Sequence, residues 1–187
     1  VERPAQNSNG QPIHWSEEGV RNFWRFFGES GVVDADGRPL VVYHGTNRLV
    51  TEFEPVWKQL DRILKPHEKT DGGSMQKYYE TAKSEPDLYF FTEDEGIAES
   101  YADQGGAPNV IAAYLRIEDL ARDDIRDNDS RDRAIDAMLN EGKDGAYFWD
   151  TSVSGKYTHR AWVVRKPTQI KSATENIGSF DPRNPDI

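Results

Sequence analysis

Six short runs of β-forming residues, separated by turns and helical segments, constrain the fold of this chain more than any other feature. The first, residues 40–44 (LVVYH), is continuously apolar, which favours a buried strand. Further runs of this kind follow at residues 88–92, 110–117, 146–149 and 161–165, with a weaker one at 169–172.

Three segments have the pattern of helices. The first begins after Ser16, a good N-cap residue that precedes apolar residues at helical spacing. Thr92 and Glu95 match a capping box, which predicts a second helix carrying Tyr101. A third helix is expected over residues 130–140. Strands and helices in this irregular order predict an α+β fold.

The length of 187 residues fits one domain. We expect residues 1–13 to be a flexible leader and residues 14–187 to form a single domain with a charged insertion at about 55–86. A helical arm, a lid and a disordered segment all remain open for this insertion. Because the chain begins at Val1 without a signal-peptide pattern, we expect it to be a piece of a longer polypeptide.

Charge and composition disfavour some functions and exclude others. With 23 basic and 33 acidic residues the net charge is −10, which disfavours general nucleic-acid binding and attachment to anionic membranes. No apolar stretch approaches the roughly 20 residues of a membrane span. The absence of cysteine excludes a thiolate nucleophile, and the four histidines show no paired ligand spacing, so no metal site is expected.

Unusual side chains stand at the ends of three apolar runs. His44, Gly45 and Thr46 end the first, an aromatic run (LYFFT) leads into the second helix, and Gln169 and Lys171 accompany the last. Each has a purely structural interpretation. The histidine fits a hydrogen-bonded turn, the aromatic residues fit a core, and the last two fit the solvated face of an edge strand.

The order of these motifs resembles the ADP-ribosyltransferase superfamily. The resemblance rests on four motifs within residues 24–187. They are YHGT, the aromatic strand running into a helix with A-x-x-Y, QIKSA and the terminal FDPRNPDI. The resemblance is to the branch with a His and a Tyr, and more narrowly to toxin-type domains of bacterial and phage polyvalent and polymorphic-toxin proteins. It implies a split β-sandwich of two antiparallel sheets with flanking helices, and NAD as the substrate in the cleft between them.

The resemblance also implies roles for single residues. His44 would hydrogen-bond the adenosine ribose of NAD, and the Gly45 backbone would hold the nicotinamide carboxamide. Tyr89 and Tyr101 would sandwich the nicotinamide ring, with Phe90 taking the place of Tyr89 if the register is shifted by one. The NAD-binding residues implied are His44, Gly45, Thr46, Tyr89, Phe90 and Tyr101, and the catalytic ones are His44, Tyr89 and Gln169.

The implied reaction breaks the bond between nicotinamide and ribose through an oxocarbenium-like transition state. The glutamate that leads a strand in related polymerases falls at Ala161 in this chain. Gln169 could orient the ribose hydroxyls, and Asp150, His159 and Glu175 are open candidates for the missing charge.

We therefore expect a mono-ADP-ribosyltransferase that serves as an effector or toxin module. An NAD glycohydrolase and a catalytically weak NAD-binding interaction module are the alternatives. The expected partners are NAD, a macromolecular acceptor, which we take to be a protein in preference to a nucleic acid, and a basic immunity protein. The expected site of action is the cytoplasm, after delivery as part of a larger secreted or injected protein.

Overall fold

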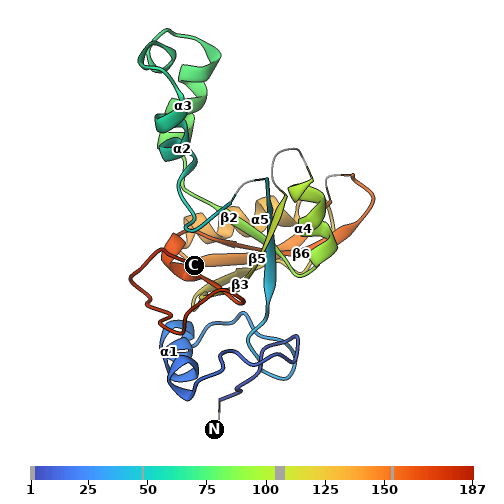
Figure 1. Ribbon diagram of the computed structural model, residues 1–187. Coiled ribbons are helices and arrows are strands. Elements are labelled where there is room, and N and C mark those ends of the chain that lie inside the picture. The colour runs from blue at the N-terminus through green and yellow to red at the C-terminus, as the bar shows by residue number, and fades with distance from the viewer. Residues whose placement is uncertain (1–2, 48, 104–107, 153) are drawn as a thin grey trace.

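The computed structural model describes residues 3–47, 49–103, 108–152 and 154–187 (Figure 1). In these residues seven strands form one mixed sheet in the order β4-β5-β6-β2-β1-β3-β7. The strands are β1 (Val42–Thr46), β2 (Tyr89–Thr92), β3 (Asn109–Leu115), β4 (Leu120–Arg122), β5 (Gly145–Thr151), β6 (Thr158–Val164) and β7 (Ile170–Ser172). The helices are α1 (Glu17–Phe27), α2 (Val56–Ile63), α3 (Ser74–Ser84), α4 (Glu95–Ala102) and α5 (Ser130–Asn140), with 3₁₀ turns η1 (Pro66–Lys69) and η2 (Pro167–Gln169).

The pairing between neighbouring strands is shortest in the middle of the sheet. β1 and β2 are joined by a single residue pair, Tyr43 with Thr92, whereas β6 pairs along its whole length with β5. The α+β class and all six expected strands are confirmed, and β4 is an additional short strand, parallel to β5. The expected two-sheet sandwich is not confirmed, because the strands are continuous in one order.

Two apolar clusters pack against the sheet. Alternation along a strand explains the division, since successive side chains point to opposite faces. On β6, Trp162 and Val164 belong to the larger cluster, whereas Ala161 and Val163 belong to the smaller one. Helix α1 adds its phenylalanines to the larger cluster and α5 covers the smaller one.

Residues 3–13, expected as a flexible leader, pack against the domain. Ile13 is part of the larger cluster. Asn7 is 3% exposed, and its Nδ2 donates to the Tyr114 hydroxyl at 2.9 Å. The polar residues of this segment thus form hydrogen bonds within local turns and with the core.

Helix α4 starts differently from its expected capping box. Asp94, not Thr92, is the N-cap, and its carboxylate accepts a hydrogen bond from the Ile97 amide at 3.1 Å. The Thr92 hydroxyl instead accepts from the Asp94 amide and hydrogen-bonds His159. The Thr92 hydroxyl is therefore used between strands β2 and β6, and the Asp94 carboxylate caps the helix.

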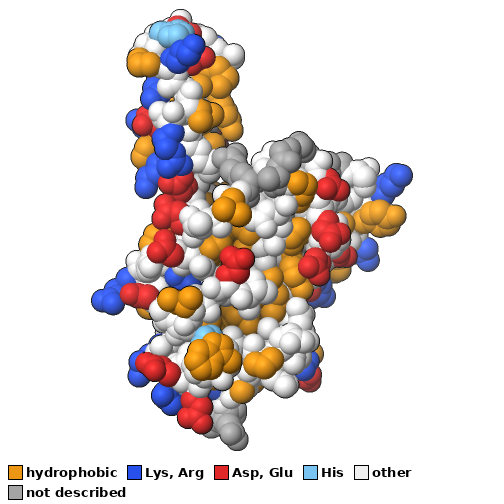
Figure 2. Space-filling model, in the orientation of Figure 1, with side chains coloured by type: hydrophobic (Ala, Val, Ile, Leu, Met, Phe, Trp, Pro, Cys, Tyr) orange, Lys and Arg blue, Asp and Glu red, His pale blue; other side chains and the backbone are white. Residues whose placement is uncertain are grey.

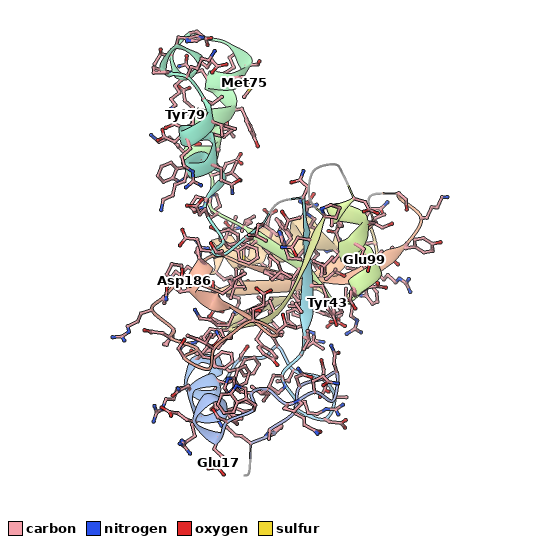
Figure 3. All side chains as sticks on the ribbon, in the orientation of Figure 1. Glu17, Tyr43, Met75, Tyr79, Glu99 and Asp186 are labelled. Carbon is pink, nitrogen blue, oxygen red and sulfur yellow. The ribbon has the colours of Figure 1, made fainter. Side chains whose placement is uncertain are left out.

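Of the three possibilities for the charged insertion, the structure shows the helical arm. Helices α2 and α3 form a hairpin that projects away from the sheet, with Met75 and Tyr79 on it (Figures 1 and 3). The Tyr79 hydroxyl donates to Asp61 at 2.7 Å, and Lys69 also hydrogen-bonds Asp61. Because no residue of α3 is buried, polar contacts within the hairpin supply much of its cohesion.

Candidate active site where strands β1 and β2 part

A pocket lies where β1 and β2 part. In the described part of the chain these strands pair nowhere beyond Tyr43 and Thr92. We call the space of about 280 Å³ beside this pair the junction pocket. Its lining residues are Tyr43, His44, Gly45, Phe90, Phe91, Thr92, Ala98, Tyr101, Arg131, Asp150, His159 and Ala161.

A second cavity of about 440 Å³ adjoins it at the base of the helical arm. We call it the arm cavity. It shares His44 and Phe90 with the junction pocket, and residues from the start of α2 and the end of α3 form part of its wall. The two spaces are therefore neighbours along β1 and β2.

His44 is held in one tautomer. Its Nδ1 lies 2.8 Å from the carbonyl oxygen of Phe90, and since a carbonyl can only accept, Nδ1 carries the proton. Burial lowers the pKa of His44. The ring is therefore neutral at neutral pH, with Nε2 as a hydrogen-bond acceptor.

Gly45 allows α4 to approach β1. A Cβ at this position would overlap the backbone carbonyl of Ala98. Any side chain would therefore push the helix away from the strand. Because α4 also carries Tyr101, this contact places an aromatic ring at the pocket.

Of the aromatic residues that line the junction pocket, Phe90 and Tyr101 belong to the two segments in which the resemblance places the stacking rings. Tyr89 is not among the lining residues of the pocket, and its ring lies 5.7 Å from that of Phe53. Of the two residues considered for this position, Phe90 is the one that lines the junction pocket. Thr46 and Tyr89 line the arm cavity instead.

A carboxylate and a cation also reach the junction pocket. Arg131, at the start of α5, lies over the ring of Phe90 at 4.9 Å. Its Nη1 is 3.9 Å from Oδ2 of Asp150. Burial and the charge of Asp150 raise the pKa of Tyr101, which keeps its phenol protonated.

His159 is buried beside Asp150. It is 8% exposed, and its Nδ1 is 3.0 Å from the Thr92 hydroxyl. Its Nε2 is buried and has no hydrogen-bond partner in the described residues. Ala161, where the glutamate was expected, also lines the pocket. Two of the three candidates for the missing charge, Asp150 and His159, line the same pocket.

Gln169 lies outside both cavities. Its Nε2 donates to the carbonyls of Arg116 and Asp144, at 2.9 and 2.8 Å. Its Oε1 accepts from the amides of Arg165 and Lys166, at 3.1 and 2.9 Å. The amide is therefore fully used in joining backbone segments around β7.

Lys171 has a similar role nearby. It is 2% exposed, and its Nζ donates to the carbonyls of Asn184 and Asp186, at 2.7 and 2.5 Å. The QIKSA segment thus fastens the C-terminal segment to the sheet, and the solvated-face interpretation of Gln169 and Lys171 is wrong. Glu175 is exposed and lines neither cavity.

Sequence reasoning did not single out Arg131. A lone arginine at the start of a charged helix matches no motif, and only the packing of α5 on β5 brings it to the pocket. Among the described residues no group of side chains could hold a metal ion, and no helix there has the length and hydropathy needed to cross a bilayer.

Comparison with known proteins identifies the family. Searches of curated proteins and of solved structures found no match. The family model described as ADP-ribosyltransferase in polyvalent proteins matches residues 34–180, which include all seven strands, the helical arm and the junction pocket. Since this match covers well over half of the chain, the protein belongs to the family of ADP-ribosyltransferases found in polyvalent proteins.

Proposed function

We propose that this chain is an NAD-dependent mono-ADP-ribosyltransferase, an effector or toxin module that modifies a macromolecule and releases nicotinamide. One observation carries the proposal. His44, Gly45, Phe90 and Tyr101 line one pocket together with the carboxylate of Asp150. His44 and Gly45 offer hydrogen bonds to a nicotinamide nucleoside, and Phe90 and Tyr101 offer stacking surfaces. The negative charge of Asp150 suits the cleavage of the bond between nicotinamide and ribose.

The binding roles follow from the groups present. Nicotinamide stacks between Phe90 and Tyr101, where each aromatic contact is worth about 0.5–1.5 kcal/mol. The Gly45 backbone hydrogen-bonds the carboxamide. His44, neutral and protonated at Nδ1, offers Nε2 to a ribose hydroxyl.

In the reaction, the C–N bond between ribose and nicotinamide breaks and its electron pair leaves with nicotinamide. The ribose carbon gains positive character and then accepts an electron pair from the acceptor nucleophile, which loses its proton. Asp150 is the one carboxylate among the described residues that line the junction pocket. We assign it the stabilisation of this developing charge, and the proposed site leaves Gln169 out.

A second candidate is a catalytically weak NAD-binding module. Ala161 favours it, because this residue lines the pocket at the position where the resemblance implies a glutamate. An NAD glycohydrolase would use the same site with water as the acceptor. In each case the site of action is the cytoplasm after delivery within a larger protein, and a basic immunity protein suits the net charge of −10.

The test uses NAD labelled separately in its nicotinamide and adenine parts. The protein is incubated with each form, with and without cell lysate. Nicotinamide release together with adenine label on macromolecules supports transfer, whereas release without such label supports hydrolysis. NAD binding without release supports the weak module, and no binding at all overturns the proposal.

A further inference from the structure

We propose that the arm cavity binds a cationic side chain, a guanidinium or an ammonium group, of a protein acceptor. The inference rests on the proposed function, since an acceptor must reach the ribose next to His44. It adds the chemical class of the acceptor segment and assigns the helical arm a role in holding it.

The wall of the arm cavity is acidic. Glu52, Glu54, Glu85 and Asp87 line it, and none of its described lining residues is a lysine or an arginine. Glu54 is paired with Arg62. In the described part of the chain the other three carboxylates form no ion pair. Their negative charge disfavours the diphosphate of NAD and favours a cation.

A buried hydroxyl in the same wall lacks a partner. Tyr89 is 8% exposed, and its hydroxyl forms no hydrogen bond within the described residues. Tyr89 lines the arm cavity together with Asp87, Glu54 and Glu52, and burial and the charges of these carboxylates raise the pKa of Tyr89. A buried polar group without a partner costs free energy, and an N–H donor from a ligand would remove that cost.

The remaining wall suits the stem of a long basic side chain. Phe53, Val56 and Tyr78 present apolar and aromatic surface, and Tyr78, on the arm, is half exposed. Methylene groups pack against such surface while the charged head reaches the carboxylates, and aromatic faces also attract cations.

A metal ion does not fit this wall as well. The described carboxylates do not converge into a group that could hold one. A guanidinium or ammonium group can instead reach separate acceptors through several N–H donors. On the face of the molecule shown in Figure 2, acidic side chains gather below the arm, and the arm projects from the body.

The test is calorimetric binding to the full chain without NAD. The probes are a short arginine-containing peptide, the same peptide with uncharged citrulline, and agmatine as a free guanidinium. We expect the arginine peptide to bind at least about tenfold more tightly than the citrulline peptide, and more tightly than agmatine. Equal binding of the two peptides overturns the inference, and tighter binding of agmatine overturns a protein acceptor in favour of a small free cation.

Variants locate the binding. Asp87→Asn is expected to weaken the arginine peptide about tenfold, and Tyr89→Phe, which keeps the buried ring, severalfold. Glu99→Gln is the matched control, because Glu99 is exposed on α4 and lines neither cavity (Figure 3). Unchanged binding in both variants, with unchanged melting temperature, overturns the assignment.

NAD binding, measured on the same protein, separates this inference from the proposed function. If NAD binds and the arginine peptide does not, the acceptor site is wrong while the function stands. If the arginine peptide binds with the expected variant effects and NAD does not, the arm cavity is supported as a cation site and the proposed function is wrong.

Discussion

Asp150 on β5 lies directly opposite His159 on β6, and both residues line the junction pocket. Two positions further along the same pairing, Phe148 lies opposite Ala161. Side chains two residues apart on a strand share a face, so Asp150 and His159 present polar groups on the face to which Ala161 contributes only a methyl group. The pocket thus obtains its carboxylate from the neighbouring strand.

The replacement Asp150→Asn tests this carboxylate. We expect NAD binding to change by less than about twofold and nicotinamide release to fall by about 10²–10³-fold, since one preorganised stabilising group is lost. Single-turnover release of nicotinamide measures the effect. Asp136→Asn is the control, because Asp136 is exposed on α5 and lines neither cavity. A rate in D150N equal to the control would remove Asp150 from the mechanism.

Phe90→Leu tests the stacking pair. We expect the Kd for NAD to rise about two- to tenfold, because an aromatic contact is lost while side-chain volume is nearly kept. Phe148→Leu serves for comparison, since Phe148 is buried beside Phe90 but does not line the pocket. Calorimetry on both variants at matched folding decides. Equal effects would contradict the role of Phe90.

The pKa of His44 predicts a pH dependence of stability. Because burial lowers this pKa in the folded state, the unfolded chain binds a proton more readily below its own pKa of about 6.5. The free energy of unfolding should therefore fall as the pH drops below about 6.5, until the folded-state pKa is passed. Urea unfolding at a series of pH values measures it.

His44→Gln is the comparison for this pH series, since it removes the titrating group and keeps hydrogen-bonding capacity. The difference in unfolding free energy between the original chain and H44Q should shrink on acidification. A difference that stays constant between pH 7.5 and 5 would show that the imidazole is not held neutral.

Lys171→Met tests whether the QIKSA segment is structural. The methionine keeps the apolar stem, but the carbonyls of Asn184 and Asp186 lose their donor. We expect a loss of about 1–3 kcal/mol in the free energy of unfolding. Nicotinamide release per folded molecule should not change, whereas a loss of rate at full stability would indicate a role in the reaction.

Local sequence was sufficient for most of the secondary structure. Apolar runs are written in consecutive residues, so all six expected strands and the helices after Ser16 and over residues 130–140 could be predicted from neighbouring positions. His44, Gly45 and Tyr101 were also found from their motifs, and the structure brings all three to one pocket.

Tertiary structure decided what each side chain faces. A shift of one residue along a strand turns every side chain to the other face, so the choice between Tyr89 and Phe90 depended on the packing of β2 between β1 and β6. Asp150 and Arg131 meet through the packing of α5 on β5, and Gln169 is consumed by backbone groups distant in sequence. Most strands and helices could be located from neighbouring residues, because their periodicity is local, whereas β4 and the helices of the arm could not. Which side chains meet in the pocket depends on the fold, since these contacts join residues that are far apart along the chain.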